Sequence, residues 1–263
     1  MAECYSCAML DIRRIPALTD NYLWLVREPK SGLVAVVDPA EAAPVEAALA
    51  TMGWKLTHIL NTHHHKDHVG GNLALKEKWG CHIVGPAADA ERIPGIDEEV
   101  GDGETWRLGE ESYEVFDVPG HTRGHIAYWF PDSDALFCGD TLFALGCGRL
   151  FEGTPEQMWR SLGKFDVMPD ETRVFCAHEY TQANARFALT VDGGNAALIA
   201  RAKAVDEARA KGEATVPSTL GEERATNPFL RADDPDLARN LGLDPRDPVA
   251  VFAEVRGRKD QFK

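Results

Sequence analysis

The segment 61–72 constrains this chain most, because it reads NTHHHKDHVGGN and places four imidazoles and a carboxylate within six residues. It follows directly on an apolar run that is typical of a strand. Residues two apart on an extended strand end share a face, so His63 and His65 can converge on one point. Asp67 and His68 come where the chain turns into a glycine pair and a helix, and they can aim at a neighbouring point. Because burying these groups without a metal or full hydrogen bonding would cost on the order of several kcal/mol, the segment predicts a metal site.

Three further candidate ligands also follow apolar runs: His121 in PGHTRGH, Asp140 in FCGDT and His178 in CAHEY. In α/β proteins, functional residues commonly lie where strands end and loops begin. The combined set of imidazoles and carboxylates suits two borderline divalent ions that share Asp140. Zinc is our first expectation for both ions, with iron or manganese as alternatives, because this donor set accepts all three. The seven predicted ligands are His63, His65, Asp67, His68, His121, Asp140 and His178.

The other histidines receive different interpretations. His64 occupies the intervening position on the opposite face of the strand end, so we expect it not to be a ligand. His125 lies four residues beyond His121, and it could orient a neighbour by a hydrogen bond of the kind that metal-bound imidazoles need. His58 and His82 are isolated, and we expect them to be incidental surface residues.

Strand and helix patterns alternate over the first two thirds of the chain. Helical patterns at 41–53, 70–80 and 154–165 lie between several of the β-rich runs, which predicts α/β layers with central sheets covered by helices. From about residue 180 the segments 181–191 and 195–212 read as consecutive helices, without a convincing strand after them. We therefore expect a catalytic domain over 1–180 and a smaller helical domain over 181–263. The β-rich runs are 33–39, 57–63, 81–86, 112–121, 125–131, 135–141 and 173–179.

Charge and composition exclude several classes of protein. The 42 acidic and 28 basic residues give a net charge of −14, which argues against a general binder of nucleic acid or anionic membranes. The longest apolar run falls short of the ~18 residues that a membrane span needs, and the first residues lack a secretory signal pattern. Six cysteines are too few for a disulfide framework, and we expect the lone CxxC of Cys4 and Cys7 to be incidental. We expect a cytoplasmic protein with reduced thiols.

The motifs THxHxDH (62–68), GHTxGH (120–125) and GD (139–140), with the late His178, resemble the metallo-β-lactamase superfamily. This resemblance implies an αββα sandwich with a metal site at one edge. Longer stretches are similar to the glyoxalase II (hydroxyacylglutathione hydrolase) family, and the similarity runs from about residue 15 to the C-terminus. Those stretches are PALTDNYLWLV (16–26), GDTLFALGCGRLFEGT (139–154), CAHEYTQANARFA (176–188), TVPSTLGEERATNPFLR (215–231) and VRGRKDQF (255–262).

The resemblance implies a ligand assignment and a reaction. One metal is assigned to His63, His65 and His121, the other to Asp67, His68 and His178, and Asp140 bridges the two. The reaction implied is hydrolysis of S-(2-hydroxyacyl)glutathione, such as S-D-lactoylglutathione, to glutathione and D-lactate, the second step of methylglyoxal detoxification. A hydroxide that bridges the metals would attack the thioester. Asp67 would orient that hydroxide, so Asp67 and Asp140 are the expected catalytic residues.

The glutathione moiety is expected at a set of basic and aromatic residues that the resemblance implies: Arg149, Phe151, Tyr180, Arg256 and Lys259. Two of them depart from the family pattern, since Arg149 stands where lysine is frequent and Phe151 where some members have tyrosine. Residues 255–263 contain four Lys or Arg and one Asp, a pattern that a solvated charge run would also explain. Glutathione carries two carboxylates, which such side chains recognise by charge-assisted hydrogen bonds.

Three alternatives stay open at this stage. A persulfide dioxygenase of the same superfamily would use a single iron and O₂, but the helical extension with NPFLR and RKDQF argues against it. A metal-dependent nuclease conflicts with the acidic net charge, and a non-catalytic module should have lost some of the seven ligands. The expected partner is thus a small glutathione thioester, with neither nucleic acid nor membrane. The sequence does not fix the oligomeric state, and a monomer is the working expectation.

Overall fold

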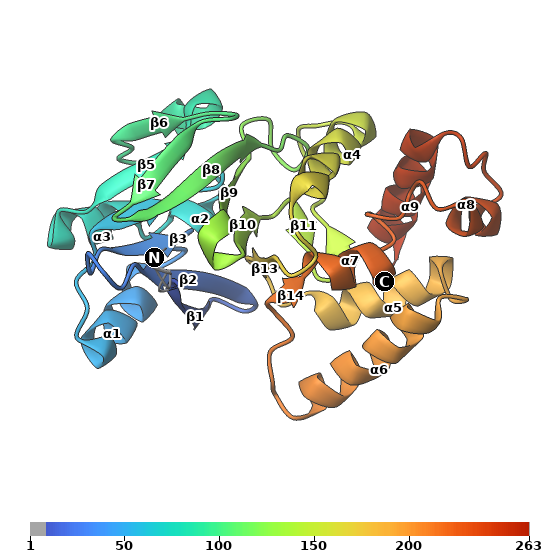
Figure 1. The fold of residues 1–263 in the computed structure, drawn as a ribbon, viewed down its shortest axis with the longest axis horizontal. Coiled ribbons are helices and arrows are strands. Elements are labelled where there is room, and N and C mark those ends of the chain that lie inside the picture. The colour runs from blue at the N-terminus through green and yellow to red at the C-terminus, as the bar shows by residue number, and fades with distance from the viewer. Residues whose placement is uncertain (1–8, 263) are drawn as a thin grey trace, which may run out of the picture.

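The computed structural model describes residues 9–262 and contains two six-stranded sheets packed face to face, with helices on the outside (Figure 1). The first sheet, in the order β1-β2-β3-β4-β5-β6, consists of β1 (Asp11–Ala17), β2 (Asn21–Arg27), β3 (Val34–Val37), β4 (His58–Leu60), β5 (His82–Pro86) and β6 (Glu98–Val100). The second sheet, in the order β14-β13-β10-β9-β8-β7, consists of β14 (Ser218–Thr219), β13 (Arg173–Cys176), β10 (Ala135–Gly139), β9 (Ile126–Phe130), β8 (Glu111–Asp117) and β7 (Thr105–Leu108). The predicted αββα arrangement is confirmed.

Alternation along the strands of the first sheet divides the core into two clusters. On β2, Trp24 and Val26 face the second sheet, while Leu23 and Leu25 face the outer helices. The outer cluster takes in Val45 of α1 (Ala42–Met52), together with residues of α3 (Asn72–Trp79). Both faces of the sheet are therefore buried, which agrees with near-continuous apolar strands such as β3.

Strand direction brings the loops of the functional site together. Strands β3, β4, β5 and β6 are parallel, and so are β10 and β13 of the second sheet. Because the carboxyl ends of parallel strands meet at one edge of a sheet, the residues after β3 and β4 are neighbours in space. The short helix α2 (Lys66–Val69) follows β4 at this edge.

The connection after β10 forms a two-stranded hairpin, β11 (Leu142–Phe143) with β12 (Gly146–Cys147). A loop over residues 148–153 leads from it to α4 (Pro155–Gly163). Thr154 caps this helix in a reciprocal capping box with Gln157, which fixes where the loop ends. The described residues also include three short 3₁₀ helices: η1 (Ala87–Arg92) after β5, η2 (Pro131–Ser133) after β9 and η3 (Lys164–Val167) after α4.

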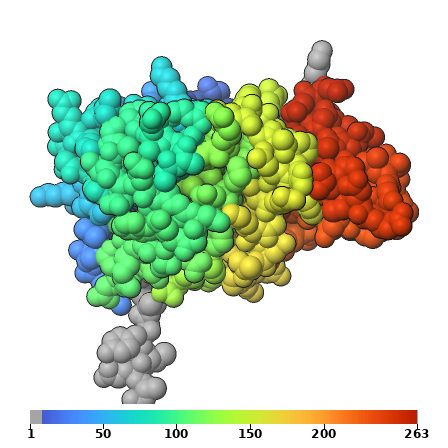
Figure 2. Space-filling model, turned by 90° about the horizontal axis from the view of Figure 1, so that it is seen from above, coloured from blue at the N-terminus to red at the C-terminus, as the bar shows by residue number. Residues whose placement is uncertain are grey.

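The C-terminal part is mainly helical and forms one end of the molecule (Figure 2). Its helices are α5 (Thr181–Val191), α6 (Ala196–Ala210), α7 (Leu220–Thr226), α8 (Pro235–Leu241) and α9 (Pro248–Gln261). Phe229 and Phe252 belong to the same buried cluster as Phe137 of β10, so the helices pack onto the sandwich itself. The two-residue strand β14 was not expected beyond residue 180, and it pairs with β13.

Most expected strands and helices are present, with ends that differ by a few residues. The patterns did not identify β1, β2, β6 and β7. Strands β1 and β7 are partly exposed and β6 has three residues, so their signals are weak, whereas β2 is buried over nearly its whole length and its apolar signal was missed. Cys4 and Cys7 lie outside the described residues. Among residues 9–262, none of the helices is long and apolar enough to cross a membrane.

Candidate metal centre and adjoining cavity

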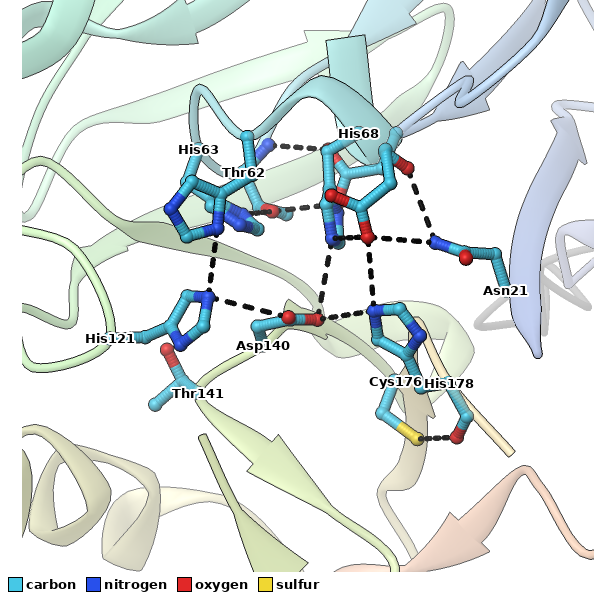
Figure 3. Close-up of polar contacts among 12 residues, drawn as sticks. Asn21, Thr62, His63, His68, His121, Asp140, Thr141, Cys176 and His178 are labelled. Atoms are coloured by element: carbon cyan, nitrogen blue, oxygen red, sulfur yellow. Dashed lines mark hydrogen bonds and ion pairs between the residues drawn. The ribbon is translucent and has the colours of Figure 1, made fainter. Parts of the chain in front are cut away.

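The predicted ligands come together at one edge of the sandwich, although they lie in separate stretches of the chain. His63 and His65 follow β4, and α2 supplies Asp67 and His68. The other three follow β8, β10 and β13, and Figure 3 shows Asp140 between His121 and His178. Among the described residues, three groups have ligand atoms within 4.8 Å of one another, and two of them consist of predicted ligands: His63, His65 and His121, and Asp67, His68 and His178.

Asp140 lies between these two groups. Its Oδ2 is 3.4 Å from Nε2 of His121, while its Oδ1 is 3.3 Å from Nε2 of His178 and 3.5 Å from Nε2 of His68. The two oxygens of one carboxylate thus face different groups of ligand atoms. This is the arrangement that a shared ligand requires.

Several polar atoms at the centre of the cluster are buried without a hydrogen-bond partner: His63 Nε2, His68 Nε2 and Asp140 Oδ1. An unsatisfied buried polar atom costs about 1–3 kcal/mol, so three in one place need an explanation. A cation bound among them would satisfy all three. The imidazole and carboxylate donors fit a borderline divalent ion, and we conclude that this is a divalent-metal site.

Hydrogen bonds at the far nitrogens orient the rings toward the centre. His68 Nδ1 lies 3.0 Å from Asp38 Oδ2, and His178 Nδ1 lies 2.8 Å from Asp20 Oδ1. His121 Nδ1 donates to the carbonyl oxygen of Arg149 at 2.8 Å. Each contact leaves Nε2 directed at the cluster, as is usual for metal-bound histidines.

Asp38 is the main residue of the cluster that sequence reasoning missed. Its carboxylate accepts from the backbone N–H of Thr62 at 2.8 Å and from the Thr62 hydroxyl at 2.6 Å, besides contacting His68. Although it lies near His63 and His68, its oxygens are already occupied, so it orients ligands rather than serving as one. Asp38 follows β3 directly, the same strand-end position that identified the predicted ligands. Asn21, also missed, donates from Nδ2 to Asp67 Oδ2 at 3.2 Å.

Protonation states in the cluster follow from burial and charge. Burial would raise the pKa of the Asp140 carboxyl, but His68 and His178 outweigh it and hold that pKa well below its usual range. Burial, with the neighbouring imidazoles, lowers the pKa of His63 well below its usual value. Burial would also lower the pKa of His68, yet Asp140 and Asp38 raise it. The cluster therefore contains a charged carboxylate at Asp140, a neutral imidazole at His63 and, at His68, surroundings that stabilise a positive charge. A divalent ion bound there would supply that charge.

Four histidines lie outside the predicted ligand set. His82 is exposed, as expected, whereas His58 is partly buried in β4 and contacts the Thr57 hydroxyl, so it is not the surface residue that we expected. His125 Nε2 accepts from the backbone N–H of Asp140 at 3.1 Å, and its ring stacks on His63 at 4.5 Å. His64 points away from the cluster and contacts Asp89. Neither His64 nor His125 belongs to a group of potential ligands among the described residues.

A cavity of about 420 Å³ opens onto the cluster. It includes five of the predicted ligands and all five predicted substrate contacts, together with three residues that the sequence did not single out: Phe143, Cys147 and Asn184. The remaining lining residues are His65, Asp67, His121, Asp140, Arg149, Phe151, His178, Tyr180, Arg256 and Lys259. The fold thus joins the C-terminal basic residues to the metal centre.

Aromatic residues form the part of the wall nearest the cluster. The Tyr180 ring stacks on His178 with centroids 4.7 Å apart and planes at 4°. The Phe151 ring meets His121 edge-on at 5.2 Å, and it remains 60% exposed. Arg149 lies over Phe151, with its guanidinium carbon 5.9 Å from the ring centre. These side chains lie on the solvent side of the cluster.

The two basic residues that α9 supplies to the cavity, Arg256 and Lys259, differ in their burial and in their contacts within the protein. Arg256 is buried, and it donates from Nη1 to the carbonyl oxygen of Cys147 at 2.9 Å and from Nη2 to Asp260 at 3.0 Å. Asp260 also faces Arg149, with 3.4 Å between Oδ1 and Nε, and sequence reasoning missed this link. Burial, assisted by Arg256, lowers the pKa of Lys259 to about 8.

Comparison with known proteins agrees with this geometry. The family described as "Metallo-beta-lactamase superfamily" matches residues 19–178, and fold, cluster and match together define a protein of that superfamily. "Hydroxyacylglutathione hydrolase C-terminus" matches residues 179–262. The hydroxyacylglutathione hydrolase of Methylococcus capsulatus is 62% identical over 255 residues, covering 97% of this chain and 100% of that protein. That of Rhodospirillum rubrum is 56% identical over 253 residues, covering 96% and 99%. The chain belongs to the hydroxyacylglutathione hydrolase family.

Solved structures at lower identity share the fold. ETHE1 from Myxococcus xanthus superposes with a TM-score of 0.65 at 24% identity, covering 96% of this chain and all of that one. TTHA1623, crystallised in a di-iron-bound form, superposes with a TM-score of 0.60 at 26% identity, covering 82% of this chain and 98% of that one.

Proposed function

We propose that the protein hydrolyses S-(2-hydroxyacyl)glutathione, with S-D-lactoylglutathione as its substrate and glutathione and D-lactate as products. The main observation behind this proposal is that one cavity is lined both by residues of the metal cluster and by Arg149, Arg256 and Lys259. These cations can form charge-assisted hydrogen bonds with the two carboxylates of glutathione while the thioester lies at the cluster. Relatives named hydroxyacylglutathione hydrolase, at 62% and 56% identity over nearly the whole chain, support a thioester hydrolase of this kind.

We propose that the cluster holds two divalent ions, with zinc expected first. His63, His65 and His121 would hold one, Asp67, His68 and His178 the other, and Asp140 both. The two groups of ligand atoms and the two-sided position of Asp140 support this assignment, as does the di-iron form of TTHA1623. When bound, such ions supply Lewis acidity, which makes water nucleophilic near neutral pH and stabilises negative charge on a thioester oxygen.

The chain's own residues would align the reaction. Asp67 accepts from Asn21, which fixes the carboxylate that orients the attacking water. The leaving thiolate is a weak base compared with an alkoxide, so its departure does not require a general acid from the protein. Tyr180 and Phe151 form the apolar wall, and the cations of the cavity hold the glutathione moiety in place.

The division of labour between the two parts of the chain is also a proposal. We assign the catalytic role to residues 1–180 and substrate binding to residues 181–263, because α9 supplies Arg256 and Lys259 to the cavity. We further propose a cytoplasmic monomer that binds neither nucleic acid nor membrane. The net charge of −14 supports the lack of a nucleic-acid or membrane partner, and the buried, unpaired thiols of Cys81, Cys138, Cys147 and Cys176 support a reducing compartment. The monomer is carried over from the sequence analysis.

The test is hydrolysis of S-D-lactoylglutathione by purified protein, with metals quantified on the same sample. We expect turnover that a chelator abolishes and that added metal restores, with about two ions per chain. Oxygen uptake on glutathione persulfide tests the dioxygenase alternative in parallel. Thioester turnover without oxygen uptake supports the proposal, and oxygen uptake with a single bound iron would refute it.

A further inference from the structure

The loop over residues 148–153 carries Arg149 and Phe151, two mostly exposed residues of the cavity wall. One side of the loop is bound to the segment that supplies His121. The Phe151 N–H donates to the carbonyl oxygen of His121 at 3.3 Å, and the Gly153 N–H donates to that of Gly120 at 3.0 Å. A Cβ atom at Gly153 would lie 2.6 Å from the Gly120 Cα, so the two backbones are in close contact. The position of the wall is thus tied to the position of a metal ligand.

The other side of the loop is held through Glu152. Its carboxylate accepts two parallel hydrogen bonds from Arg92, at 2.6 Å from Nη1 and at 3.1 Å from Nη2. The backbone N–H of Arg123 donates to the same carboxylate at 2.8 Å. Since Arg92 ends η1 on the first sheet's side and Glu152 follows the β11–β12 hairpin, this contact links the two halves of the sandwich beside Phe151, a residue of the cavity wall.

Arg92 is itself held in place by His64 and Asp89. Its Nε donates to Asp89 Oδ1 at 3.1 Å, and Nη1 donates to His64 Nε2 at 3.1 Å. Because a guanidinium can only donate, His64 Nε2 must accept, so its proton lies on Nδ1 and is donated to Asp89 at 2.9 Å. Asp89 packs on the backbone near His121, since a Cβ at Gly124 would lie 2.3 Å from its Cγ. Three side chains from two loops thus form a closed ring.

We propose that His64, Asp89, Arg92 and Glu152 form a clamp that positions loop 148–153 over the cavity and thereby sets the affinity for the glutathione moiety. The four are positioning residues, because none of them lines the cavity and they act on substrate through the loop that carries Arg149 and Phe151. The clamp gives His64, which lies between two predicted ligands, a role apart from metal binding. The statement about affinity rests on the proposed function, whereas the statement about the loop does not.

The chemistry of the pair favours a fixed geometry. Hydrogen bonding from Arg92 lowers the pKa of Glu152 to about 2, so the carboxylate stays charged throughout the neutral range. An arginine fork fixes direction as well as distance, and a lysine at this position would supply only a point charge. Because both side chains are partly exposed, we expect the clamp to change the position of the loop more than the overall stability.

The test uses the full-length metal-loaded protein and the variants Arg92→Ala, Arg92→Lys and Glu152→Gln. The matched control is Arg160→Ala, which removes an exposed arginine paired with Glu156 on α4. Two measurements are made on each protein: hydrogen–deuterium exchange of the backbone amides of residues 148–153, and kcat and KM for S-D-lactoylglutathione with bound metal quantified. Glu152→Gln keeps the shape of the side chain, so it remains informative if Arg92→Ala folds poorly.

We expect faster exchange in the loop and a KM about tenfold higher for Arg92→Ala and Glu152→Gln, with kcat within about twofold and metal content unchanged. Arg92→Lys should recover part of the loss, and the double variant should be no worse than either single one, because both remove the same contact. Unchanged exchange in both single variants would overturn the clamp, and so would a loss of metal together with kcat. If the wild type lacked thioesterase activity, the proposed function would fail, while faster exchange would still support the clamp.

Discussion

The metal cluster and the wall of the adjoining cavity touch each other, yet they are built in different ways. The predicted ligands His63 and His178 are buried in segments that follow β4 and β13, and His68 is buried in the short helix α2. In the wall, Phe151 and Tyr180 are exposed and come from a loop and from the start of α5. A buried centre thus borders a wall that is partly exposed to solvent.

This difference separates two properties of the proposed enzyme. Changes in the cluster should affect metal retention and kcat, because the reacting atoms lie there. Changes in the wall should affect KM, because we propose that the wall binds the glutathione moiety, and binding that is equal in ground and transition states leaves kcat unaltered. The predictions below test whether the separation holds, and they run from the largest effect to the smallest.

Asp140→Ala should have the largest effect. It removes the carboxylate that faces both groups of ligand atoms and leaves the imidazoles of His68, His121 and His178 without their shared partner. We expect kcat/KM to fall by more than about 1,000-fold, with loss of bound metal. Metal analysis and steady-state kinetics check this. Near wild-type turnover with a full metal complement would refute the shared role of Asp140.

Asp38→Ala tests whether the cluster depends on residues beyond the ligands. Without Asp38 the His68 ring loses the partner of its Nδ1, so we expect metal affinity or activity to fall by about 10- to 100-fold. Metal titration against a competing chelator measures this. Asp38→Asn serves as a milder second variant, and Asp244→Ala on the exposed surface is the control. A metal affinity unchanged in both Asp38 variants would mean that the His68 ring does not need Asp38 to be oriented toward the metal.

The wall should respond to pH through Lys259. Its pKa of about 8 means that the ammonium is present below pH 8 and is lost above it. Because only the charged form attracts a carboxylate, KM should rise by about fivefold between about pH 7 and pH 9, while kcat does not follow the same pKa. Lys259→Arg stays charged across this range and should remove the rise. A rise that persists in this variant would assign the titration to another group.

Phe151→Tyr should produce the smallest effect. It adds the hydroxyl found in some members of the family at an exposed position, so we expect KM to fall by about two- to threefold with an unchanged melting temperature. Kinetics and thermal denaturation of both proteins make the comparison. A changed kcat would break the separation between wall and cluster.

Sequence reasoning picked out side chains that the fold brings together, because most of them follow a strand whose apolar run is visible locally and Asp67 and His68 lie in the helix directly after one. Asp38 carried the same strand-end signal, but it was not recognised as part of the cluster. Arg256 and Lys259 of the basic tail line the cavity, as expected. The hydrogen bonds from Arg256 to Cys147 and Asp260, however, could not be read from composition. These hydrogen bonds depend on how α9 packs against the β11–β12 hairpin.

The amino-acid sequence alone determined the α/β class, the donor chemistry at the strand ends and the acidic character that excludes a general phosphate-binding surface. Tertiary structure decided which partners orient the ligands and how the loop carrying Arg149 is held. The contact between Arg92 and Glu152 joins residues 60 positions apart, and that between His178 and Asp20 joins residues 158 apart. Periodicity reports burial over a few residues, whereas such contacts depend on sheet register and loop geometry, which only the folded chain specifies.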